Sequence, residues 1–220
     1  GLYNQSTTVR EIARIIRRGG TSGIGIAAYE MGGFLVDGGH TFGTGKDKQD
    51  FRPTSACRDV RPPLVTMRHK VPKEWRIFLA IPNVARGAYG KRELDIFQKY
   101  CPVPLKDVHE ICYHILARMV PSLVEEDLDG FGASVNRIQE LGFKKVELML
   151  QDPIVHKLVA AMREAGAACS GLSSFGPTVY ALADTQGRDI EAAANEIMKE
   201  VGGELLITRP RNEGARVRIC

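Results

Sequence analysis

Hydrophobic residues recur at helical spacing in several segments of the chain. Residues 9–16 carry apolar side chains three or four positions apart, which predicts an amphipathic helix, and Thr8 and Glu11 are spaced as a capping box at its start. The same periodicity predicts further helices, two of which have Ser22 and Asp152 as N-cap residues. These further helical segments are residues 24–31, 105–119, 122–141, 153–165 and 189–201.

Short apolar runs between these segments predict β-strands. The runs are residues 34–36, 64–68, 76–81, 178–183, 205–208 and 215–219. This succession of helices and strands indicates an α+β protein in which helices cover one face of a sheet. The apolar stripe along residues 105–119 is expected to belong to the core. A change of pattern near residues 83–90 predicts two domains, residues 1–84 and 85–220.

The composition fits a globular protein and argues against a membrane protein or a disulfide-rich protein. The chain has 220 residues, of which 44% are hydrophobic and 25% are charged, enough for one or two packed domains. Its longest apolar runs are far shorter than the roughly 20 residues that span a bilayer, so no membrane segment is expected. The five cysteines form no C-x-x-C pair, which favours a reducing compartment over a disulfide framework or a zinc site. A cytoplasmic protein is therefore predicted.

Positive charge is concentrated in one polar stretch. The net charge is only +4, yet residues 46–76 contain nine Lys and Arg against four Asp and Glu. A solvated loop and an anion-binding loop are both open interpretations of this stretch. Nucleic acid is the weaker candidate ligand, because Phe51 and Trp75 are too sparse to form a base-stacking surface. A loop as long as residues 41–63 is more often functional than a casual connection.

Four glycines fall within seven residues directly before the second predicted helix, in the segment RGGTSGIG at residues 18–25. Glycine lets backbone N–H groups approach an anion, and a helix start adds the positive end of its dipole, so a phosphate site is predicted. A helix-packing turn is the alternative, and neither a Walker A loop nor a dinucleotide fingerprint fits the order of residues. The candidate phosphate-binding residues are Arg18, Gly19, Gly20, Thr21, Ser22, Gly23 and Gly25.

A second loop rich in glycine and serine lies between a predicted helix and the strand at residues 178–183. It reads SGLSSFGP at residues 170–177. Clustered hydroxyls and glycines in such a turn can line a ligand, and a β-turn whose serines bond within the turn is the alternative. The candidate substrate-binding residues in this loop are Ser170, Gly171, Ser173, Ser174 and Gly176.

Together the two loops resemble those of the galactokinase, homoserine kinase and mevalonate kinase (GHMP) superfamily. GLSSFGPTVYAL is similar to its third motif, and RGGTSGIGIAA stands where its phosphate-binding motif lies. The resemblance implies a GHMP-kinase-like two-domain fold, with part of a ribosomal protein S5 domain 2-like N-terminal domain and a ferredoxin-like α/β sandwich as C-terminal domain. The usual Gly-Leu-Gly-Ser-Ser-Ala order is altered, which argues against ordinary ATP-dependent kinase activity. A small-molecule kinase of this superfamily is the alternative function.

Closer still is the resemblance to the archaeal beta-ribofuranosylaminobenzene 5'-phosphate synthase family of methanopterin biosynthesis. It rests on RGGTSGIG, GGFLVDGGH, the basic stretch and SGLSSFGPTVYA, and it covers nearly the whole chain. That family implies a transfer in which phosphoribosyl pyrophosphate loses pyrophosphate and 4-hydroxybenzoate or 4-aminobenzoate loses carbon dioxide. The family carries an N-terminal portion before this point, so we expect Gly1 not to be the natural start, or a partner segment to complete the fold. A homodimer is expected from the superfamily alone.

The implied phosphoribosyl transfer suggests roles for further residues. Arg52, Arg58 and Arg61 are expected to pair with pyrophosphate or with the benzoate carboxylate. Asp37 and His40, after a predicted strand, are the catalytic candidates, for a Mg²⁺ contact by Asp37 and for proton handling. A plain turn at Asp37 and a packed or surface histidine at His40 are the alternatives.

The remaining histidines and the basic stretch lead to simpler interpretations. His109, His114 and His156 fall in helical segments without metal-ligand grouping and are expected to be structural. A non-catalytic module that binds anions or nucleic acid is a third hypothesis and ranks last. We expect Gly23→Val to abolish substrate binding with the fold retained, and Arg58→Ala to raise the apparent KM for phosphoribosyl pyrophosphate.

Overall fold

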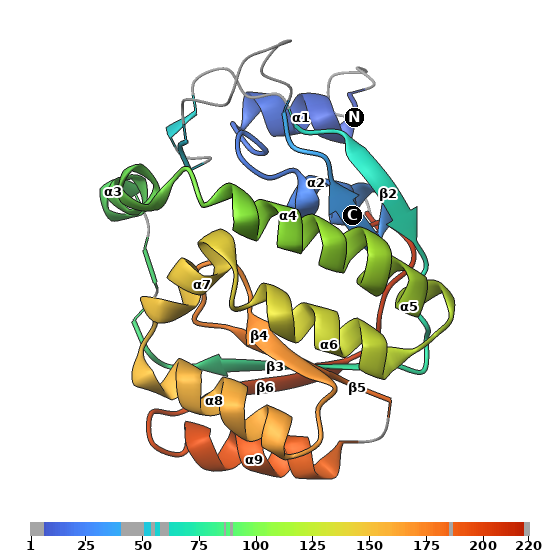
Figure 1. Cartoon of the computed structure of the whole chain (residues 1–220), viewed down its shortest axis with the longest axis vertical. Helices are drawn as coiled ribbons and strands as arrows, with labels where there is room; N and C mark the ends of the chain where they lie inside the picture. Colours follow the sequence, from blue (N-terminus) through green and yellow to red (C-terminus); the bar gives the residue numbers. More distant parts are fainter. Residues whose placement is uncertain are drawn as a thin grey trace. The chain divides into compact units, whose positions relative to one another are not determined.

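The computed structural model describes residues 7–40, 51–53, 56–57, 62–85, 87–88, 90–184 and 187–217 (Figure 1). The chain forms two compact units, each made of segments that are discontinuous in sequence. Unit 1 comprises residues 1–71, 90–101 and 211–220, and unit 2 comprises residues 72–89 and 102–210. These units are discontinuous in sequence and do not test the predicted domain boundary between residues 84 and 85, which stays a prediction. In the described part of the chain, no helix combines the length and the apolar character needed to cross a bilayer.

Unit 1 contains three helices and a two-stranded sheet among its described residues. They are α1 (Val9–Ile15), α2 (Ile24–Met31), β1 (Phe34–Asp37), β2 (Val65–His69) and α3 (Gly90–Tyr100). The predicted capping box is confirmed, since Thr8 Oγ1 accepts from Glu11 N–H at 3.2 Å and Glu11 Oε2 accepts from Thr8 N–H at 2.7 Å. The helix ends when Arg17 takes a left-handed conformation with φ of 55°.

The segment after residue 210 packs against α2 and β2 within unit 1. The Asn212 amide bonds to both the N–H and the carbonyl of Val71 at 2.8 Å. Arg68 donates to Gly32 O at 3.1 Å and to Asn212 O at 2.7 Å. A Cβ at Gly32 would collide with the backbone of Glu213, so glycine is needed where the two segments pass. The strand expected from residue 215 is wrong for residues 215–217, which form no ladder, and its last two residues lie outside the described part.

Unit 2 is built on a four-stranded antiparallel sheet. Its elements are β3 (Arg76–Pro82), α4 (Leu105–Tyr113), the π-helical segment η2 (His114–Met119), α5 (Val120–Val124), α6 (Leu128–Ile138), α7 (Gly142–Met149), α8 (Pro153–Glu164), β4 (Cys169–Leu172), β5 (Val179–Ala183), α9 (Arg188–Met198) and β6 (Gly203–Thr208). The strand order is β4-β5-β3-β6, and every neighbouring pair is antiparallel. β5 thus lies between β3 and β4, and β3 lies between β5 and β6, which is the split βαβ pattern of a ferredoxin-like fold.

The core of unit 2 lies between the sheet and the helices α8 and α9, which run along one side of the sheet (Figure 1). Phe78 on β3, Leu158 on α8 and Ile190 on α9 are almost fully buried there. The Asp152 cap is confirmed, since its Oδ1 accepts from Ile154 N–H at 2.9 Å, with Pro153 as the first helical residue. The predicted α+β class and ferredoxin-like sheet are therefore confirmed.

α6 lies beside β4, at the edge of this sheet (Figure 1). The open edge of β4 is satisfied by α6 and the residue after it, because Ser170 N–H donates to Asn136 at 3.2 Å and Leu172 N–H donates to Gln139 at 3.0 Å. These side chains take the place of a further strand, which explains how β4 is buried along its whole length.

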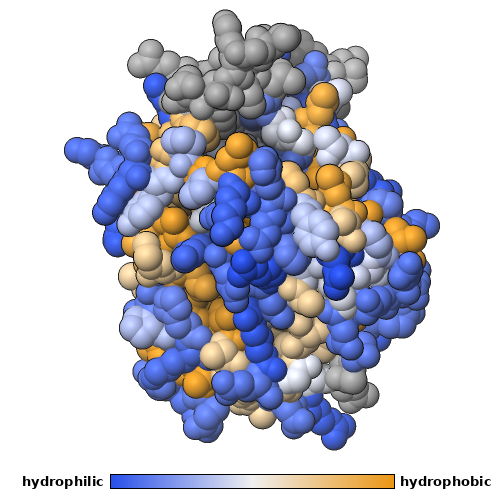
Figure 2. Space-filling view, in the orientation of Figure 1, coloured by the Kyte–Doolittle hydropathy of each residue, from blue (hydrophilic) through white to orange (hydrophobic). Residues whose placement is uncertain are grey.

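The long helical run from α4 to α5 is only partly core. Met119 is 6% exposed, but Leu105 is 66% exposed and Leu116 is 51% exposed, so the expectation of one continuous buried stripe is wrong. The π-helical turn of η2 follows α4 and shifts the helix face by part of a turn from His114 onward. Hydrophobic side chains in orange accordingly remain visible among hydrophilic ones on the face shown in Figure 2.

Candidate functional site

The glycine-rich loop ends at the start of α2, where a carboxylate already binds. Gly23 is the N-cap residue, and its N–H donates to Asp37 Oδ2 at 2.6 Å. Ser22, predicted as the N-cap, instead accepts from Ile24 N–H at 3.3 Å and donates from its hydroxyl to Asp37 at 3.4 Å. The Asp37 charge therefore lies at the positive end of the α2 dipole, where a phosphate would also be favoured.

Asp37 reaches this position because the strand ladder is irregular there. The register between β1 and β2 shifts between Val36 and Asp37, and such a bulge turns a side chain away from the regular direction. The other carboxylate oxygen, Oδ1, accepts from Gly39 N–H at 2.8 Å. The turn interpretation of Asp37-Gly38-Gly39 thus describes part of the geometry, while the contact with Gly23 joins the turn to the glycine loop. A ligand phosphate would compete with Asp37 for Gly23 N–H.

The glycines of the loop have different surroundings. A Cβ at Gly23 would lie 2.7 Å from Cδ of Pro63, and one at Gly19 would lie 2.6 Å from Cδ1 of Ile26. A Cβ at Gly25 would meet nothing within 4 Å. Close packing therefore accounts for two of these glycines, and Gly25 leaves open space at the helix start. The expectation that Gly23→Val keeps the fold does not follow, because the rigid Pro63 ring would have to shift.

The described part of the basic loop comes close to the glycine loop. Thr21 Oγ1 donates to Arg52 O at 2.5 Å, and the Cys57 thiol lies 3.9 Å from the same hydroxyl. The side chains of Arg18 and Arg52 are exposed, and His40 is half-buried. Arg58 and Arg61 lie outside the described residues. Of the predicted site residues in unit 1, the structure thus brings Thr21, Ser22 and Gly23 together with Asp37 and the backbone of residue 52.

The glycine- and serine-rich loop of unit 2 is partly strand, which corrects its prediction as a loop throughout. Ser170 and Gly171 lie inside β4 and are buried, so a ligand contact there would require β4 to open. The hydroxyls of Ser173 and Ser174 are exposed in the turn that follows, and Gly176 is half-buried. Ser170 and Gly171 are buried because β4 pairs with β5, and Ser170 lies opposite Ala181 in that ladder. The accessible polar groups of the motif therefore belong to the turn.

Burial controls the acid–base behaviour around β4. It raises the pKa of the Cys169 thiol to about 12, partly offset by the Arg163 guanidinium. Burial also raises the pKa of the Tyr180 hydroxyl above its usual range, and Gln139 Nε2 donates to that hydroxyl at 3.2 Å. Both groups are therefore neutral near pH 7 and serve packing rather than nucleophilic or proton-transfer chemistry.

The donor set around Asp37 limits what a metal ion would find. Within the described ranges, no group of three or more His, Cys, Asp or Glu is placed to hold a metal. Asp37 supplies one carboxylate, and its neighbours at this point are the N–H groups of Gly23 and Gly39 and the Ser22 hydroxyl. Mg²⁺ commonly uses one or two carboxylates together with waters and substrate phosphates. Asp37 fits as a single protein ligand that would first leave Gly23 and Gly39.

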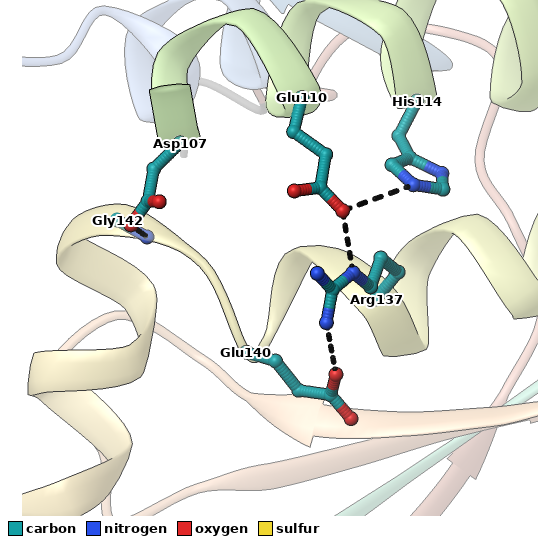
Figure 3. Close-up of polar contacts among 6 residues, drawn as sticks. All are labelled: Asp107, Glu110, His114, Arg137, Glu140 and Gly142. Carbon is teal, nitrogen blue, oxygen red and sulfur yellow. Dashed lines mark hydrogen bonds and ion pairs between the residues drawn. The ribbon is translucent and has the colours of Figure 1, made fainter. Parts of the chain in front are cut away.

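The three helical histidines show no metal-site grouping in the described structure. His109 and His156 are exposed on α4 and α8. His114 begins η2, with its Nε2 4.0 Å from Glu110 Oε1, within a helix-to-helix contact (Figure 3). The structural role expected for them stays a prediction.

Known proteins match this chain over nearly its whole length. A family model described as GHMP kinases C terminal matches residues 119–200. The beta-ribofuranosylphenol 5'-phosphate synthase of Methanocaldococcus jannaschii is 50% identical over 218 residues, which are 98% of this chain and 64% of that protein. The protein of the same name from Archaeoglobus fulgidus is 44% identical over 220 residues, which are 99% of this chain and 67% of that protein. The chain thus spans 64% and 67% of the length of these two relatives.

Solved structures share the fold at lower identity. Homoserine kinase from Cytophaga hutchinsonii aligns with a TM-score of 0.61 at 18% identity, over 86% of this chain and 52% of that chain. A putative homoserine kinase from Listeria monocytogenes aligns with a TM-score of 0.55 at 17% identity, over 97% of this chain and 61% of that chain. These likenesses confirm the GHMP-kinase-like fold. With 44% identity to a relative that it covers over 67% of its length, the chain belongs to the beta-ribofuranosylphenol 5'-phosphate synthase family.

Proposed function

We propose that this protein catalyses a decarboxylating phosphoribosyl transfer in methanopterin biosynthesis. The observation that carries the proposal is the 44–50% identity with relatives named beta-ribofuranosylphenol 5'-phosphate synthase over almost the entire chain. A phenol product favours 4-hydroxybenzoate over 4-aminobenzoate as acceptor, because loss of carbon dioxide from 4-hydroxybenzoate leaves a phenol ring. The donor is phosphoribosyl pyrophosphate.

The reaction exchanges one bond at the ribose and one at the ring. The bond from ribose C1 to the pyrophosphate oxygen breaks, and pyrophosphate leaves with the electron pair. The ring carbon that bears the carboxylate bonds to C1, and the bond to the carboxylate then breaks, so that carbon dioxide leaves and the pair returns to the ring. The developing positive charge at C1 requires a site that neutralises phosphate, aligns the ring carbon and excludes water.

The geometry of unit 1 supports a phosphate-binding role for the glycine loop. Asp37 accepts from Gly23 N–H at the start of α2, so the site already stabilises a negative charge there. In the proposal, a substrate phosphate replaces this carboxylate and is held by the loop residues Arg18 to Gly25. Arg52, Arg58 and Arg61 pair with pyrophosphate or the benzoate carboxylate as bidentate partners. Once displaced, Asp37 is free to act elsewhere in the site.

Two further roles complete the proposed chemistry. His40 holds the proton of the ring hydroxyl, which increases electron release from the ring. Ser173 and Ser174, which are exposed in the turn after β4, bind the substrate together with the half-buried Gly176. Asp37 would be the protein ligand of a Mg²⁺ ion, which would neutralise phosphate charge when bound.

Compartment and assembly belong to the same proposal. Cys57, Cys112 and Cys169 are free thiols, which supports a reducing cytoplasm. A homodimer remains the expectation from the superfamily.

Release of carbon dioxide tests the proposed reaction directly. The full-length protein is incubated with phosphoribosyl pyrophosphate, Mg²⁺ and carboxyl-labelled 4-hydroxybenzoate or 4-aminobenzoate. Labelled carbon dioxide and pyrophosphate should appear in equal amounts and only when both substrates are present, faster with the hydroxybenzoate. Absence of release with both acceptors, with ATP consumed on an alcohol substrate instead, would contradict the proposal and favour the kinase.

A further inference from the structure

The turn after β4 is contacted from outside by α7 and by the residues that follow it. Within the turn, residues 173–178, Ser173 N–H donates to Thr178 O and Gly176 N–H donates to Ser173 O, both at 2.9 Å. These two bonds fix the turn's own shape but not its position. The exposed hydroxyls of Ser173 and Ser174 depend on that position, because a small displacement of binding groups can cost a large factor in rate.

Contacts from α7 and the residues that follow it reach both ends of the turn. Lys144 Nζ donates to Leu172 O at 3.3 Å, just before the turn. Gln151 Nε2 donates to Phe175 O at 3.1 Å, inside it. The ring of Phe143 packs edge-on against Phe175, with ring centroids 5.8 Å apart. Lys144 is itself paired with Glu147 on the same helix. These contacts add to the β4–β5 pairing and to the Gln139 bond, and they link the turn to α7.

The start of α7 is fixed by a carboxylate from another helix. Its N-cap residue, Leu141, has no side-chain acceptor, and Gly142 N–H instead donates to Asp107 Oδ2 at 2.9 Å (Figure 3). Asp107 lies on α4, which is tied to α6 through Glu110. Arg137 donates to Glu110 and to the neighbouring Glu140, each at 2.7 Å (Figure 3). Asp107 thus caps α7 from α4, and α4 is joined to α6 by the bond between Glu110 and Arg137.

We infer that Asp107 and Gln151 are positioning residues for the turn at residues 173–178. Asp107 sets where α7 begins, and Gln151 transmits that position to Phe175 between the exposed Ser174 and Gly176. A Cβ at Gly176 would lie 2.7 Å from Gln151 Oε1, so the amide also fits closely against the turn backbone. The inference rests on the proposed function, because the turn is part of the proposed substrate site.

Hydrogen–deuterium exchange on the full-length protein tests the positioning without any reaction. Asp107→Ala should speed exchange in residues 172–178 about fivefold, as expected for the loss of a cap worth about 1 kcal/mol. Asp107→Asn keeps an oxygen acceptor and should restore slow exchange. Asp127→Ala is the matched control, because Asp127 Oδ1 accepts from Gly130 N–H at 3.0 Å at the start of α6 in the same way. Equal exchange in residues 172–178 for Asp107→Ala and Asp127→Ala would overturn the inference.

Steady-state kinetics provide the functional readout. Gln151→Ala is the second variant, and it keeps the test possible if Asp107→Ala does not fold. Gln151→Ala should lower kcat/KM about tenfold while its Tm stays close to that of Asp127→Ala. A merely structural role would lower Tm and leave kcat and KM of the folded enzyme unchanged, which would contradict the inference. Wild-type protein that releases no carbon dioxide would instead refute the proposed function, and the exchange result would still decide the positioning role.

Discussion

At the scale of single residues, the glycines near the start of α2 serve different purposes. Gly23 leaves room for Pro63, whereas Gly25 borders open space. Arg17, directly before the exposed Arg18, ends α1 in a left-handed conformation. Glycine content alone therefore does not identify which position serves a ligand.

Alanine substitutions at Gly25 and Gly23 separate binding from packing. Gly25→Ala adds a methyl group within α2 without a clash, so the free energy of unfolding should stay constant or rise by up to about 1 kcal/mol. Its affinity for phosphoribosyl pyrophosphate should fall, because the methyl group occupies the space left at the helix start. Gly23→Ala should lower the free energy of unfolding by about 1–3 kcal/mol through the clash with Pro63.

Urea unfolding measures the free energy of unfolding of each variant, and titration calorimetry measures its affinity for phosphoribosyl pyrophosphate. Gly25→Ala binding as tightly as the wild type would place the phosphate away from this helix start.

At the scale of elements, α4 is joined to α6 by a charge network that predicts a pH dependence. The bond from Arg137 holds the pKa of the Glu110 carboxyl below its ordinary value of 4.5. Folding therefore favours ionised Glu110, and this stabilisation is present above that ordinary value and is lost as pH falls through the lowered pKa. Glu110→Gln should thus be less stable than the wild type at pH 7, and the difference should shrink as pH falls below 4.5.

A double-mutant cycle tests whether Arg137 is the partner that lowers the pKa of Glu110. In an Arg137→Gln background, Glu110→Gln should lose most of its pH-dependent effect, as measured by urea unfolding at pH 7, 5 and 3. An unchanged pH-dependent difference in that background would show that Arg137 is not the cause.

At the scale of the whole molecule, a large cluster of buried hydrophobic residues lies in unit 2. Cys169 lies in the interior of unit 2, fully buried, with its thiol pKa raised to about 12 by burial. Its alkylation therefore requires opening of β4, whereas Cys112 on α4 is exposed.

Alkylation with iodoacetamide at pH 8 should label Cys112 at least about a thousandfold faster than Cys169, because core openings cost several kcal/mol. Peptide mass spectrometry over time measures both rates in one sample. Comparable rates in native buffer would show that β4 opens readily, and would make Ser170 and Gly171 accessible to a ligand.

The sequence by itself determined what depends on neighbouring residues and on family motifs. The capping box at Thr8, the start of α8 at Asp152 and the α+β class were predicted correctly, because these signals lie within a few positions of one another. α3 and α7 were not predicted. In α3, Leu94 and Phe97 are three positions apart and offered only a weak helical signal. α7 begins at Gly142, whose N–H is capped by Asp107, 35 positions earlier in the sequence.

Only the tertiary structure decided how the parts of each candidate site meet. It brought Asp37 to Gly23, buried Ser170 and Gly171 in β4, and linked Asp107 to α7. Each of these contacts joins residues that are distant in sequence, and each depends on a bulge, a strand edge or a helix crossing. Local periodicity contains no information on such contacts, because it fixes which face of an element is apolar and not which partner will cover it.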